Sequence, residues 1–174
     1  VVRGIHGQSN WVKYAMNILT CGFCGHRDAP GELYERVHSA VEELIVCQGV
    51  GRFYCGDKGN FDRIAAQAVR NLQNRYPHIR LYKVLAYYPV DQTPPDNRFD
   101  GTIYPEGLET VPPRYAISRR NRWMAAQIDF LVAYVQRAGG AREMLDHAVR
   151  LGRARILNLA EEPLGCPLFS TRYP

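Results

Sequence analysis

Three glycine-containing segments of this sequence combine backbone freedom with nearby charged side chains. They are residues 24–27 (CGHR), residues 56–62 (GDKGNFD) and residues 139–141 (GGA). Glycine allows an anion to approach the backbone closely, and the free N–H groups at a helix start attract negative charge. These residue types therefore point to binding of a phosphate or a similar anion.

The segment 52–65 (RFYCGDKGNFDRIA) shows this pattern most clearly. Residues 53–55 are predicted as a short buried strand, residues 56–59 as a tight loop, and Asn60 as the N-cap of a helix. A strand that leads through a glycine loop into a helix start would cradle a phosphate. A plain β-to-α turn, in which the glycines supply positive φ angles, would produce the same pattern.

Five polar side chains near these loops are candidates for ligand contacts. Arg27 could hold a phosphate with its planar guanidinium, or could form a surface ion pair. His26 is interpreted as a hydrogen-bonding loop residue rather than an acid or base. Asp62 lies in the first turn of the predicted helix, where a carboxylate is favourable, and could alternatively contact ribose hydroxyls. Arg120 and Asn121 could face the same pocket or lie on a solvated basic helix face.

The cysteines allow a different hypothesis. Cys21 and Cys24 form a C-x-x-C pair, a spacing that serves thiol–disulfide exchange in some folds. Together with His26 and Cys55 they would also make a zinc set. Cysteines at strand ends are usually small buried hydrophobes. Thiol redox or zinc chemistry is therefore a remote alternative, and no metal site is predicted.

Predicted strands and helices alternate along the chain. This alternation predicts an α/β, Rossmann-like three-layer sandwich, with a mostly parallel sheet of about five strands and helices on both faces. Ligands of such sheets bind beyond the carboxyl ends of the strands, where the three glycine loops are expected. The predicted strands are residues 17–23, 53–55, 79–86, 128–135 and 155–159. The first predicted helix begins at Pro30 and ends just before Gly49, and the second begins at Asn60 and ends before Pro77; the other two are residues 115–127 and 139–151.

The chain is expected to form one domain, residues 16–174. Residues 1–15 have no clear period and precede Met16, so we interpret them as a leader, either an over-extended gene start or a cloning remnant. Prolines interrupt residues 87–113, which predicts a long loop that could serve as a lid or pocket wall.

The composition is that of a globular protein without membrane segments. The 174 residues are 46% hydrophobic and 22% charged, with five cysteines and a net charge of +5. This mildly basic balance suits an anionic ligand, or nucleic acid held loosely, but the basic residues form no long run. No apolar stretch is long enough to span a membrane, and no secretory signal is visible. We expect a reduced, cytoplasmic protein, and a homo-oligomer is compatible with the sequence.

The order of several motifs resembles the SLOG superfamily, in its YpsA-like branch. The similar motifs cover residues 16–159: Cys24-Gly25-His26-Arg27, then G-x-x-G-N-F-D at residues 56–62, residues 102–109, 116–118 and 120–124, and Gly139-Gly140-Ala141. Relatives of this branch include the cytokinin-activating phosphoribohydrolases and the DNA-processing protein A family. The resemblance implies a bacterial-type protein with a Rossmann-like fold.

The resemblance also implies a pocket for a nucleotide or a nucleotide-derived anionic ligand, with no required cofactor. The protein would act as a sensor or as an enzyme. The implied ligand-binding residues are Gly22, Gly25, His26, Arg27, Gly56, Gly59, Asn60, Asp62, Arg120, Asn121, Gly139 and Gly140.

Two further functions stay open. One is a nucleotide-processing hydrolase that resembles the phosphoribohydrolases, with Asp62 and Glu143 as candidate catalytic residues. Residues 138–143 (AGGARE) lack the proline and the G-T element of the P-G-G-x-G-T-x-x-E motif, which puts this activity in doubt. The other is a binder of single-stranded nucleic acid, for which exposed tyrosines would supply stacking. The candidates for stacking are Tyr87, Tyr88 and Tyr104.

Overall fold

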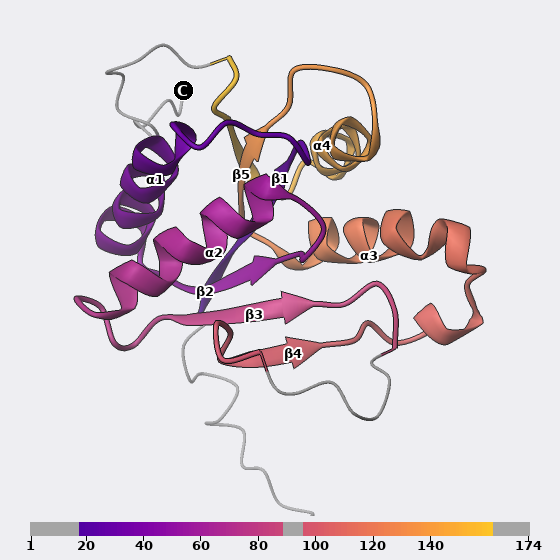
Figure 1. The fold of residues 1–174 in the computed structure, drawn as a ribbon, viewed down its shortest axis with the longest axis horizontal. Coiled ribbons are helices and arrows are strands. Elements are labelled where there is room, and N and C mark those ends of the chain that lie inside the picture. Colours follow the sequence, from indigo (N-terminus) through magenta and orange to yellow (C-terminus); the bar gives the residue numbers. More distant parts are fainter. Residues whose placement is uncertain (1–17, 89–95, 162–174) are drawn as a thin grey trace, which may run out of the picture.

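The computed structural model describes residues 18–88 and 96–161 (Figure 1). The predicted leader, residues 1–15, lies outside the described residues, as do residues 89–95 of the predicted loop. Within the described ranges, the strands are β1 (Leu19–Gly25), β2 (Val50–Cys55), β3 (Arg80–Val84), β4 (Gly101–Ile103), β5 (Phe130–Tyr134) and β6 (Arg155–Asn158). The helices are α1 (Leu33–Gln48), α2 (Asn60–Gln73), α3 (Pro113–Gln127) and α4 (Gly140–Leu151), with a 3-10 turn, η2 (Leu108–Thr110).

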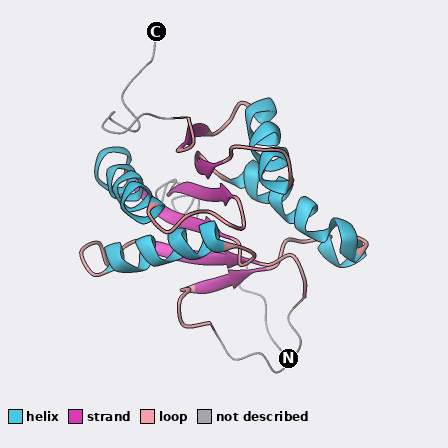
Figure 2. Cartoon of the chain, turned by 45° about the horizontal axis from the view of Figure 1, so that its top comes forward, coloured by secondary structure: helices cyan, strands magenta, loops and turns pink. Residues whose placement is uncertain are grey.

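The strands form one parallel sheet with helices on both faces (Figure 2). Side chains alternate between the faces along each strand. Cys21 and Phe23 belong to the apolar core that contains residues of α1 and α2, whereas Cys24 belongs to the core that contains residues of α3 and α4. The predicted Rossmann-like α/β sandwich is confirmed. None of the helices in the described part of the chain has the length and apolarity needed to cross a membrane.

The sequence predicts about five strands, and the described chain has six, because β4 lies inside the segment predicted as a loop. β4 is a three-residue edge strand, too short to show a period in the sequence. Asp100 holds it beside β3: its N–H donates to the Leu81 carbonyl at 2.8 Å, and its Oδ2 accepts the Leu81 N–H at 2.7 Å. The turn η2 also interrupts the predicted loop.

The strand order creates a crevice at the carboxyl end of β1. The order is β4-β3-β2-β1-β5-β6, so the chain builds outward from β1 to β4 and then returns through α3 to β5, on the other side of β1. The connections after β1 and β5 therefore diverge to opposite faces of the sheet. In open parallel sheets, ligands bind at such a switch point.

A close contact between Gly25 and Phe61 fixes the first turn of α2 against the end of β1. A Cβ at Gly25 would lie 2.3 Å from Phe61 Cγ, a distance that real Cβ atoms do not show. The Phe61 ring is fully buried and stacks with Tyr134 of β5 at 6.3 Å between centroids. Packing therefore requires glycine at position 25.

Gly25→Ala should lower the free energy of unfolding by about 1–3 kcal/mol, because the added methyl overpacks against a buried ring. Urea unfolding followed by circular dichroism measures the change. The matched control is Gly31→Ala, whose new Cβ would meet no atom within 4 Å and should not lower stability. Equal stability of Gly25→Ala and the wild type would contradict the packing role.

Candidate functional site

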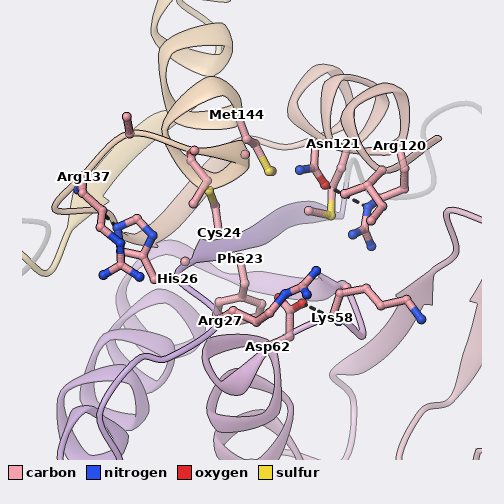
Figure 3. Close-up of a pocket in the computed structure, with 18 residues that line it drawn as sticks. Phe23, Cys24, His26, Arg27, Lys58, Asp62, Arg120, Asn121, Arg137 and Met144 are labelled. Atoms are coloured by element: carbon pink, nitrogen blue, oxygen red, sulfur yellow. Dashed lines mark hydrogen bonds between the residues drawn. The ribbon is translucent and has the colours of Figure 1, made fainter. Parts of the chain in front are cut away.

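A cavity of about 290 Å³ occupies the switch point (Figure 3). Its walls come from the end of β1 and the loop after it, the loop after β2 with the start of α2, helix α3, and the connection between β5 and α4. Its lining residues are Phe23, Cys24, Gly25, His26, Arg27, Gly56, Lys58, Asp62, Ile117, Arg120, Asn121, Met124, Arg137, Ala138, Gly139, Gly140, Ala141 and Met144.

Most residues that the sequence predicts as ligand-binding line this cavity. Gly22, Gly59 and Asn60 do not. Gly22 lies in the middle of β1, where a Cβ would be 3.0 Å from Ile128 Cδ1. The side-chain amide of Asn60 donates to the Ala29 carbonyl, away from the cavity. The predicted residues that do line it are Gly25, His26, Arg27, Gly56, Asp62, Arg120, Asn121, Gly139 and Gly140.

His26 holds the loop between β5 and α4. Its Nε2 accepts the N–H of Gln136 at 2.9 Å and that of Arg137 at 3.3 Å, and only 7% of the residue is exposed. Burial lowers the pKa of His26, and the positive charge of Arg137 lowers it further. A protonated ring would turn an N–H toward these two donors, so the fold favours the neutral ring. His26 is thus the hydrogen-bonding loop residue that the sequence predicts.

The loop after β2 is closed rather than open to an anion. The Asp62 carboxylate accepts the Lys58 N–H at 3.1 Å, and the Asn60 N–H donates to the Arg27 carbonyl at 2.9 Å. Gly59, which precedes the first residue of α2, has a φ of 173°, so it does not supply a positive φ angle. Its Cβ would lie 2.9 Å from Arg27 Cα, and glycine here allows two loops to touch. The sequence predicts Asn60 as the N-cap of α2, but in the structure the N-cap is Gly59.

The loop before α4 is the open one. Gly139 has a φ of 133°, which favours glycine, and a Cβ at Gly139 or Gly140 would meet no atom within 4 Å. The first N–H groups of a helix have no partner within the helix, and they carry the positive end of its dipole. Since both glycines line the cavity, this helix start offers backbone donors to an anion.

Arg120 brings a buried positive charge to the other side of the cavity (Figure 3). It is 3% exposed, and its guanidinium donates to the Val84 carbonyl at 2.7 Å and to Asn121 Oδ1 at 2.9 Å. A guanidinium has five N–H donors, so others stay available to a ligand. Among the described residues Arg120 forms no ion pair, since no carboxylate oxygen lies within 4.0 Å. The sequence left open whether Arg120 faces the pocket, and the structure places it there.

Asp62 is the one carboxylate among the lining residues. Burial raises its pKa, and Asp57 raises it further, whereas Arg120 and the Lys58 N–H act in the opposite direction. The other candidate acid, Glu143, is exposed and lines a small neighbouring hollow instead. Of the two candidate catalytic residues, only Asp62 therefore reaches the main cavity.

The cysteines are separated by the sheet. Cys21 and Cys24 lie on opposite faces of β1, because residues three apart in a strand point in opposite directions. Burial raises the pKa of Cys21 and of Cys55, and it raises the pKa of Cys24 to about 12. This geometry argues against the thiol-exchange alternative, which needs two adjacent and reactive sulfurs. Within the described residues, no group of three potential metal ligands is found.

Several lining residues were not predicted from the sequence. Lys58 and Arg137 are exposed loop cations with no pattern that would mark them. Met124 and Met144 lie in apolar helix stripes, which look the same whether they face a core or a cavity. The remaining unpredicted residues are Phe23, Cys24, Ile117, Ala138 and Ala141.

No family model and no curated protein matches this sequence. Among solved structures, DNA processing protein A from Streptococcus pneumoniae matches 85% of the chain with a TM-score of 0.61 and 16% identity. The chain spans about half of that protein, 52% of its length. DNA processing protein A from Helicobacter pylori, described as binding single-stranded DNA, matches 85% of this chain and 67% of its own, with a TM-score of 0.56 and 16% identity.

A third similar structure is a molybdenum cofactor binding protein from the bacterium Rippkaea orientalis. It matches 82% of this chain and 78% of its own, with a TM-score of 0.57 and 14% identity. At these identities the comparisons show the fold alone. The fold expected from the resemblance is confirmed, and DNA processing protein A, named among the relatives in the sequence analysis, is one of the similar structures.

The free energy of unfolding should fall as the pH is lowered from about 7.5 to about 5.5, because the folded chain favours neutral His26. Because the pKa of His26 is lowered in the folded state, its contribution to stability is complete above its unfolded-state pKa of about 6.5. That contribution is lost as the pH falls through the folded-state pKa. His26→Gln should remove this part of the pH dependence. Urea unfolding at a series of pH values measures both proteins.

The matched control is His147→Gln. Burial also lowers the pKa of His147, but this residue does not line the cavity. His147→Gln should keep the part of the pH dependence of the unfolding free energy that His26→Gln removes. An unchanged pH dependence in His26→Gln would show that His26 does not hold the loop through its neutral ring.

Proposed function

We propose that this protein binds a phosphate-bearing small molecule of the nucleotide type in the switch-point cavity, as a sensor or as an enzyme. The observation that carries this proposal is the pairing of the open start of α4 with the buried guanidinium of Arg120. The two features face one cavity from different elements, and each offers N–H donors that protein groups do not use up.

The charge of the cavity supports an anionic ligand. Arg27, Lys58, Arg120 and Arg137 line it, against the single carboxylate of Asp62. Arg137 also pairs with exposed Asp28, at 2.6 Å between Nη2 and Oδ1, which anchors its side chain beside the α4 start. Focused positive charge in a cavity favours a phosphate over a neutral ligand.

The structural neighbours support the same class of ligand. One is described as binding single-stranded DNA and another as binding the molybdenum cofactor. Single-stranded DNA is a phosphate-bearing polymer, so a phosphate site in this chain agrees with that class of ligand. The comparisons do not favour one of them for this chain, because the identities are 16% and 14%.

A second candidate function, binding of single-stranded nucleic acid, is favoured by exposed tyrosines before α3 and in its first turn. Tyr88 is 71% exposed and meets Tyr104 edge to face at 5.3 Å, and Tyr115 is 52% exposed with the Arg114 guanidinium 4.7 Å from its ring centre. Exposed rings beside arginine can stack on bases. An oligonucleotide would then use these rings as well as the cavity.

Gly140→Asp should weaken the binding of nucleoside monophosphates without unfolding the protein. The new carboxylate would occupy the open helix start and repel a phosphate, so affinity should fall by roughly tenfold or more. Folding should survive, because nothing lies within 4 Å of the new Cβ and an acidic residue suits a helix start. Titration calorimetry with AMP, GMP, CMP, UMP and inorganic phosphate measures the affinity.

The matched control is Gly31→Asp, which adds the same charge at an exposed glycine with equally open surroundings, outside the cavity. It should bind as the wild type does. Equal loss in both variants would assign the effect to net charge and contradict the proposed site. Salt-sensitive binding of oligo(dT) that survives Gly140→Asp would instead favour the nucleic-acid function through the tyrosines.

A further inference from the structure

We propose that Arg120 and Asp62 together form a subsite for adjacent sugar hydroxyls, so that the cavity selects ribonucleotides over their deoxy analogues. This inference rests on the proposed function and assigns a place to the ligand's sugar. Its basis is that the two side chains meet at Gly56 and that all three residues line the cavity.

The two side chains converge on one point without touching. A Cβ at Gly56 would lie 2.7 Å from Arg120 Nη1 and 2.7 Å from Asp62 Oδ2. Yet within the described part of the chain they form no ion pair, because every N to O distance between them exceeds 4.0 Å. The gap between Arg120 Nη1 and Asp62 Oδ2 is therefore a slot with a donor on one side and an acceptor on the other, too wide for a direct bond and narrow enough for one hydroxyl to reach both.

A sugar hydroxyl matches this slot because it accepts and donates hydrogen bonds at the same atom. A guanidinium N–H can donate to one hydroxyl oxygen, while the Asp62 carboxylate accepts the O–H of that hydroxyl or its neighbour. A phosphate suits the slot less well, because it would lie beside a carboxylate of like charge. Neither side chain has another described partner of opposite charge that would remove it from this role.

The rest of the cavity leaves room for the other two parts of a nucleotide. The phosphate belongs at the start of α4, where the lining residues near it include Arg137 and no carboxylate. Ile117, Met124 and Met144 form an apolar wall between α3 and α4, which suits a base. Phosphate, sugar and base thus each face a surface of matching chemistry.

The test compares ribonucleoside 5′-monophosphates with their 2′,3′-dideoxy analogues on the wild-type protein by titration calorimetry. The ribonucleotide should bind roughly 10- to 100-fold more tightly, because the analogue leaves buried polar groups without partners. Equal affinities would overturn the inference and leave the proposed function standing. Failure of every nucleotide and of inorganic phosphate to bind would overturn both.

The variant Asp62→Asn then tests whether Asp62 is responsible for the preference for ribonucleotides. The amide oxygen can still accept the Lys58 N–H, which keeps the loop closed, but the charged acceptor for the hydroxyls is lost. The ratio of ribo to dideoxy affinity should fall to about threefold or less, while inorganic phosphate binds as before. The control Glu143→Gln removes an exposed carboxylate outside the main cavity and should keep the ratio. An unchanged ratio in Asp62→Asn would overturn the assignment.

Discussion

The short loop after β1 holds the two neighbouring loops of the cavity through hydrogen bonds to their backbone. The His26 ring accepts the N–H groups of Gln136 and Arg137, and the Arg27 carbonyl accepts the N–H of Asn60. Parallel strands bring all three loops to the same edge of the sheet, and these bonds, together with the Gly59–Arg27 contact and the Arg137–Asp28 ion pair, set the distances between them. The shape of the cavity, and with it every ligand contact inferred above, depends on this central loop.

The glycines around the cavity serve different physical needs. Gly25 makes room for the Phe61 ring, Gly59 lets its loop touch the backbone of Arg27, and Gly56 makes room for Arg120. Only the pair at 139 and 140 leaves open space beside the cavity. A glycine-rich loop in a sequence is therefore ambiguous, since close packing within the protein and close approach of a ligand both require a missing Cβ.

Much of the fold could be predicted because apolar periods are local. The helix that starts at Asn60 and the strand at 130–134 follow from such periods. β4 could not be predicted, because the Asp100 contacts that hold it are not local. The candidate cavity lies at the strand-end loops that the sequence singles out. The sequence could not show which of these loops is open, because Asp62 closes its own loop through a hydrogen bond. Nor could it show that Arg120 faces the cavity, because this depends on where α3 packs.

The buried charge of Arg120 also bears on how long the protein persists in a cell. A guanidinium that is 3% exposed, without a carboxylate partner in the described chain, is costly to keep in an empty cavity. Binding of the proposed anion would offset this cost, so the filled protein would open less often than the empty one. Proteases act mainly on the opened chain. Occupancy would then set the half-life, and the abundance of the protein would follow the supply of its ligand.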